Sequence, residues 1–155
     1  MFGVVFHFVM GFVLEIQNRS ARAGQYGTYK GSANASWMSR NMILTGAVVL
    51  SFLGLHLYDF WIPEMNYKYV EVLPEDPNRY FEELVHKFES PLKTAIYSFS
   101  FIFLALHLLH GFSSSFKTVG VDSKYYNLIQ KGTFLFSVII PAGFVFIAIF
   151  HNLTS

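Results

Sequence analysis

Long apolar stretches are the feature that most constrains the fold of this 155-residue chain. A membrane-spanning helix needs about 20 largely apolar residues, and its backbone must be hydrogen-bonded within the segment because lipid offers no partner. The sequence therefore predicts an all-α fold, an integral membrane helical bundle with four transmembrane helices, formed as a single domain over residues 1–155. The expected spans lie at approximately residues 2–17, 41–62, 91–117 and 128–153.

Composition narrows the class of protein further. The chain contains 18 phenylalanines, which suit lipid-facing helices, and no cysteine. Disulfides, thiolate-held iron–sulfur clusters and c-type haem attachment are therefore excluded. A formal net charge of +1 without a basic patch gives no reason to expect a nucleic-acid partner, so the lipid bilayer is the environment we expect.

The segments between the expected spans differ in charge. Residues 18–40 carry four basic side chains and no acid, whereas residues 63–90 carry seven acids and three basic side chains. Basic segments of membrane proteins are retained on the cytoplasmic side. We therefore expect the N-terminus of this chain and the acidic segment on the outer side of the membrane. Within the acidic segment, residues 80–85 predict a short interfacial helix.

Two histidines lie deep in the expected spans, and each is followed four residues later by glycine: His7 by Gly11, and His107 by Gly111. An ionisable side chain at membrane depth is costly and usually marks a functional site. Each histidine precedes the basic end of its span by 11 residues, or about 16 Å, so the two imidazoles reach matching depth. Glycine one turn further along clears the same helix face for a flat cofactor. The spacing predicts two axial ligands of one haem iron; the alternative is two interior histidines with ordinary hydrogen bonds.

Other titratable residues give weaker indications. His56 lies nearer the outer face and is a candidate ligand of a second haem, although no remaining histidine is a convincing partner for it. His110 lies one turn beyond His107, where it is a candidate hydrogen-bond donor, a haem propionate contact or a core residue. The expected spans contain acids only near their ends, at Glu15 and Asp59, so neither a non-haem metal site nor a stand-alone enzyme is predicted.

Three further stretches carry a resemblance to a known family. They are residues 12–19 (FVLEIQNR), 34–42 (NASWMSRNM) and 106–120 (LHLLHGFSSSFKTVG). With them, the chain resembles over essentially its whole length the cytochrome b558 membrane-anchor subunit of succinate dehydrogenase and fumarate reductase, the succinate:quinone oxidoreductase family. The repeated His-x-x-x-Gly spacing with these flanks is the most specific part of the likeness.

The resemblance implies roles for particular residues. Two-haem members of the family have five spans with ligands on the first four, and His7 and His107 correspond to the pair for the haem nearer the dehydrogenase. His56 corresponds to one ligand of the outer haem, whose partner would lie on the family's first span, and that span has no counterpart in this sequence. One haem b is therefore expected, and a second is left open. Ser39 and Arg40 lie at the expected inner interface, where a haem propionate or a quinone oxygen could be held. For each single basic residue, contact with lipid phosphate or with the docked iron–sulfur subunit is the favoured alternative.

The implied function is that of an electron-transfer subunit in a bacterial inner (cytoplasmic) membrane, not an enzyme by itself. A flavoprotein subunit would oxidise succinate or reduce fumarate, and an iron–sulfur subunit would exchange electrons through the haem with membrane quinone, either menaquinone or ubiquinone. Two alternatives remain open. One is a haem-free membrane scaffold or anchor, and the other is a b-type cytochrome anchor of another respiratory dehydrogenase.

Overall fold

The computed structural model describes residues 2–22, 40–120 and 125–154, and these form helices without any strand. The expectation of an all-α fold is therefore confirmed. The elements in chain order are α1 (Phe2–Arg22), α4 (Met42–His56), η1 (Leu57–Trp61), α5 (Ile62–Met65), η2 (Asn66–Val70), α6 (Arg79–Phe88), α7 (Pro91–Thr118) and α8 (Tyr126–Thr154).

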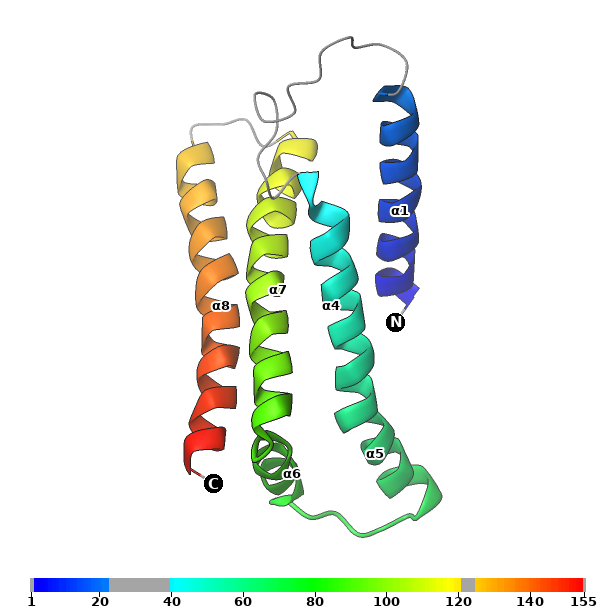
Figure 1. Cartoon of the computed structure of the whole chain (residues 1–155), viewed down its shortest axis with the longest axis vertical. Helices are drawn as coiled ribbons and strands as arrows, with labels where there is room; N and C mark the ends of the chain where they lie inside the picture. The colour runs from blue at the N-terminus through cyan, green and yellow to red at the C-terminus, as the bar shows by residue number, and fades with distance from the viewer. Residues whose placement is uncertain (1, 23–39, 121–124, 155) are drawn as a thin grey trace.

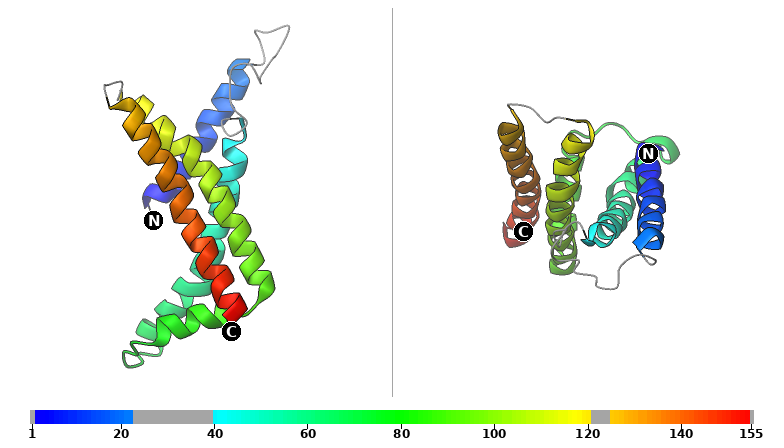
Figure 2. Two further views of the ribbon diagram at one scale, coloured as in Figure 1. Left: turned by 90° about the vertical axis from the view of Figure 1, so that its left-hand side faces the viewer. Right: turned by 90° about the horizontal axis from the view of Figure 1, so that it is seen from above.

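The four long helices follow one another across the molecule in the order α8, α7, α4 and α1 (Figures 1 and 2). α1 and α7 run in the same direction, and α4 and α8 run in the opposite direction (Figure 1). The bundle therefore has one end with the basic residues that flank α1 and α4, here called the basic end. The other end, called the acidic end, carries residues 63–90.

Three helices are long and apolar enough to cross a membrane: Met42–Val70, Pro91–Phe116 and Tyr126–Thr154. The chain is accordingly an integral membrane protein by length and composition. The first expected span, residues 2–17, lies within the 21-residue helix α1, which is not among these three in the part of the chain that the structure describes. The reason is its polar second half, where Glu15 and Arg19 form an ion pair at 2.7 Å.

The helix that begins with α4 runs further than the sequence predicts. The span is expected to end near residue 62, just before a proline, yet the helix passes through Pro63 and continues to Val70. The π-helical turn η1 lies directly before Pro63, and the Ile62 amide donates to the Leu57 carbonyl five residues back. This wider turn gives the proline ring room and reduces the cost of its missing N–H group. The acidic connecting segment therefore begins near Glu71.

The predicted short helix in the acidic segment is confirmed as α6, which lies across the end of the bundle (Figure 2). Its C-terminal carbonyl at Phe88 accepts hydrogen bonds from Asn152 Nδ2 at 2.8 Å and from Thr94 Oγ1 at 3.0 Å. The Phe88 ring is buried against Tyr97, their centres 5.3 Å apart. The hydrogen bonds that satisfy the C-terminal end of α6 therefore also fix this helix to α7 and α8.

Packing between the helices is uneven. The buried residues of α8 are all small or ring-closed and allow α7 to approach closely, as in other membrane bundles. They are Thr133, Ser137, Pro141 and Ala148. By contrast, none of residues 2–20 of α1 is buried, so this helix has the least protein around it.

Candidate cofactor site

His7 of α1 and His107 of α7 meet across the bundle, although 100 positions separate them in the sequence. Their ring centres are 6.3 Å apart and their ring planes are nearly perpendicular, at 88°. Metal–imidazole bonds are about 2.0 Å long, so two imidazoles on opposite sides of one metal ion have ring centres about 6 Å apart. The separation of His7 and His107 therefore fits two axial ligands of a single metal.

A cavity of about 350 Å³ lies beside the two histidines, and α1, α4 and α7 all contribute to its wall. Cofactor and ligand pockets are typically about 300–1,000 Å³. Towards the acidic end its wall is apolar, with Val4 and Leu53. Towards the basic end it becomes polar, with Glu15, Asn18 and His110. This gradient suits a flat molecule that has an apolar body and polar groups along one edge.

Thr45 of α4 fixes the position of the His107 ring. The Thr45 side chain is buried, with 1% of its surface exposed, and its Oγ1 lies 3.1 Å from His107 Nδ1. The same hydroxyl donates to the Met42 carbonyl at 3.0 Å. With Nδ1 engaged, Nε2 is the nitrogen of His107 that is left for a ligand in the cavity, and such an outer hydrogen bond is usual for metal-binding histidines.

Glycines make room for these side chains, but not all in the way the sequence predicts. Gly46 supports His107 directly, because a Cβ at position 46 would lie 3.3 Å from His107 Cε1. Gly11 lines the cavity beside open space, as expected for a glycine that admits a cofactor. Gly111 instead faces Met42, whose Cε would lie 2.9 Å from a Cβ at position 111. Gly111 therefore makes room for the end of the Met42 side chain and is not among the residues that line the cavity.

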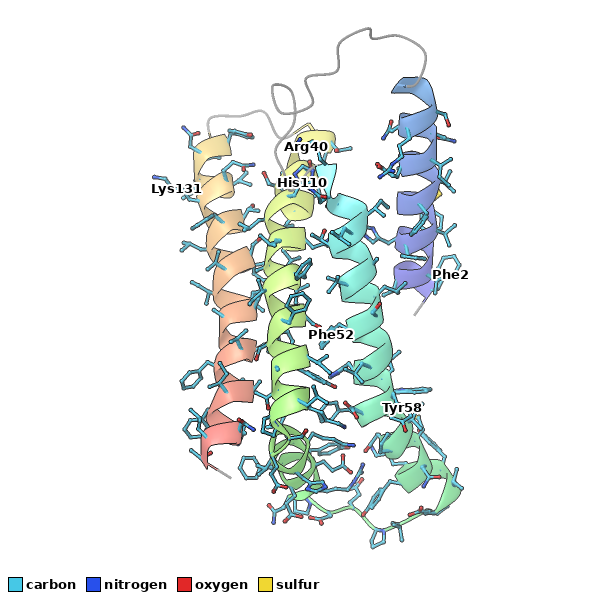
Figure 3. All side chains as sticks on the ribbon, in the orientation of Figure 1. Phe2, Arg40, Phe52, Tyr58, His110 and Lys131 are labelled. Carbon is cyan, nitrogen blue, oxygen red and sulfur yellow. The ribbon has the colours of Figure 1, made fainter. Side chains whose placement is uncertain are left out.

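Of the other residues that the sequence predicts at the basic end, His110 alone lines the cavity within the described ranges. Arg40 stands exposed at the same end of the bundle (Figure 3). Ser39 lies outside the described residues. Cationic and amide groups at this end can bind carboxylate or quinone oxygen atoms.

His56 is not brought to the same place. It lies nearly three turns from Gly46 along α4, among the rings of Phe52, Phe60 and Tyr97 at 5.8, 5.1 and 6.5 Å. In Figure 3, Phe52 lies between α4 and α7. Within the described ranges no histidine ring is paired with His56, and no group of three or more His, Cys, Asp or Glu side chains is placed to hold a metal ion.

A buried charge cluster at the acidic end was not expected from the sequence. Asp59 is 1% exposed and accepts hydrogen bonds from Lys93 Nζ at 2.6 Å and from the Tyr97 hydroxyl at 3.0 Å. Lys87 Nζ lies 3.6 Å from the same carboxylate. The cluster joins η1, α6 and α7, and its enclosure by three partners gives it a structural rather than a ligand-binding character.

Comparison with known proteins finds no family model, no curated protein and no solved structure that matches the chain. The chemistry therefore follows from the chain's own residues. Paired imidazoles, a hydroxyl that engages one outer ring nitrogen and an amphipathic cavity form a site that can hold a flat, metal-centred group by two axial nitrogen atoms.

Proposed function

We propose that this chain is a haem b-binding membrane subunit of a succinate dehydrogenase or fumarate reductase. It passes electrons between an iron–sulfur subunit and membrane quinone. The observation that carries the haem site is the approach of His7 and His107 to a ring-centre separation of 6.3 Å beside the cavity. The assignment to this family of dehydrogenases is supported by the three sequence stretches that resemble its anchor subunit.

In this proposal, residues of the chain bind the haem and influence its reduction potential. His7 and His107 would hold the haem iron through neutral ring nitrogen atoms, and Thr45 engages the second ring nitrogen of His107. Apolar walls from α1 and α4 exclude water and so influence the reduction potential. When bound, the haem would supply reversible one-electron chemistry, with His7 and His107 as the residues that hold it.

The basic end is proposed to face the cytoplasm, in a bacterial inner membrane, and to receive the iron–sulfur and flavoprotein subunits. Asn18 and His110 line the cavity at this end, and Arg40 is exposed at the same end of the bundle; these residues are proposed to bind haem propionates or a quinone oxygen. Quinone, either menaquinone or ubiquinone, is then reached from the lipid. The α1 helix is proposed as a fourth span whose polar half lies in the interfacial layer at this end.

Haem content tests the proposal directly. We expect about one low-spin b haem per chain in the detergent-purified protein, measured by pyridine haemochrome and by the reduced-minus-oxidised spectrum. The haem should be lost in His7→Ala and in His107→Ala. His86→Ala is the matched control, because the His86 side chain is 81% exposed in the acidic segment and should leave the haem in place.

The other outcomes separate the alternatives. Absence of haem, or its retention in both ligand variants, would overturn the haem site and leave a haem-free scaffold. A second haem that disappears in His56→Ala would show that another chain supplies the partner of His56. Co-purification with the subunits of a different respiratory dehydrogenase would reject the succinate or fumarate assignment while retaining the cytochrome.

A further inference from the structure

The Thr45 hydroxyl lies within hydrogen-bonding distance of two groups, the Met42 carbonyl and His107 Nδ1. A hydroxyl has one proton to donate, and Thr45 donates it to the Met42 carbonyl at 3.0 Å. Towards His107 Nδ1, at 3.1 Å, the Thr45 oxygen can then act only as an acceptor. With the Thr45 proton on the Met42 carbonyl, a neutral imidazole satisfies this contact by carrying its own proton on Nδ1, and Nε2 then keeps the lone pair that a metal requires.

We infer that Thr45 is a positioning residue that holds His107 in the Nδ1–H tautomer and so prepares Nε2 as the metal-binding atom. The inference deepens the proposed function and rests on it for the identity of the bound group. The tautomer itself is a property of the chain without any ligand. It can therefore be measured separately from haem binding.

The surroundings of Thr45 make this control effective. The side chain is 1% exposed, so water does not compete for Nδ1. Threonine in a helix has few χ1 rotamers, and its hydroxyl commonly bonds the carbonyl three or four residues back, which fixes the direction of the donated proton. Gly46 lies against the same part of the ring, where a Cβ would be 3.3 Å from Cε1 and 3.8 Å from Nδ1. Turning the ring over would exchange Nδ1 for a carbon and lose the bond to Thr45.

The first experiment reads the tautomer in the haem-free full-length chain. The protein is labelled with ¹⁵N-histidine, purified in detergent and studied by NMR, and the His107 signals are assigned by their loss in His107→Ala. We expect a protonated Nδ1 and an unprotonated Nε2. Thr45→Val, which keeps the shape and removes the hydroxyl, should move the proton to Nε2, and Thr45→Ser should restore it to Nδ1.

A matched control is available less than two turns further along α4. Ser51 is exposed and donates its hydroxyl to the Ala47 carbonyl at 2.9 Å, so it makes a similar backbone bond at the surface of the helix. Ser51→Ala should leave the His107 tautomer unchanged. A wild-type signal with Nε2 protonated, or a tautomer that is the same in Thr45→Val, would overturn the inference.

The second experiment measures haem affinity by titrating haem into the same purified chains. Loss of a partner that orients a metal-bound histidine typically lowers affinity about 10–100-fold, and this is the loss expected for Thr45→Val. An unchanged affinity in Thr45→Val would contradict the positioning role even if the proposed haem site is correct. Conversely, a chain that binds no haem but shows the Thr45-dependent tautomer would reject the proposed function and support the inference.

Discussion

Replacing Asp59 by asparagine should reveal how much the buried charge cluster contributes to stability. The substitution keeps the size of the side chain and removes its charge, so the ammonium groups of Lys93 and Lys87 lose their counter-ion. In the native protein these groups lie 2.6 and 3.6 Å from the carboxylate. Removing one partner of a buried ion pair generally costs about 3–5 kcal/mol.

The expected loss for Asp59→Asn lies at the lower end of that range. The side chains of Lys93 and Lys87 keep 35% and 28% of their surface exposed and can turn partly towards water. The Tyr97 hydroxyl, 3.0 Å from Asp59, can still donate to the amide oxygen. We therefore expect the free energy of unfolding to fall by about 3 kcal/mol, measured by SDS titration of the purified protein.

A double variant distinguishes lost charge balance from lost packing. In Asp59→Asn combined with Lys93→Met, one of the two unpaired cations is also removed, so at least half of the lost stability should return. Lys68→Met is the control at the same end of the bundle. Lys68 pairs with Glu64 at 2.6 Å, but its side chain is 47% exposed, so its loss should hardly change stability. A double variant as unstable as Asp59→Asn would refute the electrostatic explanation.

Three further predictions concern other contacts. Gly46→Val should push His107 aside, because even a Cβ lies 3.3 Å from its ring; we expect an overpacking cost of about 1–3 kcal/mol in SDS titration and reduced haem in the absorption spectrum. Asn152→Leu removes one of two donors to the Phe88 carbonyl and should cost about 1 kcal/mol, with faster hydrogen exchange in α6 but not in the centre of α7. Arg79→Gln loses the bonds to two glutamates of the acidic end, at 2.6 and 2.9 Å, and limited proteolysis of residues 71–78 should become faster. Unchanged behaviour in any of these assays would contradict the contact concerned.

The helical fold and the approach of the two histidines could be predicted because both follow from the lengths of the apolar segments and from residue positions within them. Apolar length gives the spans, and counting residues from the basic end gives the depth of His7 and His107. The continuation of the α4 helix through Pro63 could not be predicted in this way. A proline normally ends a helix, and the π-turn at residues 57–61 that precedes Pro63 has no signal in the sequence.

The contact of Thr45 with His107 could not be predicted from the sequence, for a different reason. A threonine in a membrane span usually satisfies its hydroxyl on its own helix, and Thr45 does so at Met42. Its second bond, to His107, depends on how α4 and α7 are aligned, which no local pattern records. Gly46 is a similar case, since a glycine in an apolar run indicates close approach but not the side chain that approaches. Asp59 was visible only as an acid near a span end, and its cations lie 28 and 34 positions away.

The sparse packing of α1 against the rest of the bundle has a thermodynamic consequence. None of residues 2–20 is buried, whereas the wall of the cavity is shared among α1, α4 and α7. A molecule that fills this cavity contacts all three helices, so its binding free energy also holds α1 to the bundle. At a free ligand concentration of 100 times Kd, ligand binding stabilises the assembled bundle by about 2.7 kcal/mol. This stabilisation is lost when the ligand leaves the cavity. The attachment of α1 is therefore a function of ligand concentration, whereas α8 contributes no residue to the cavity wall.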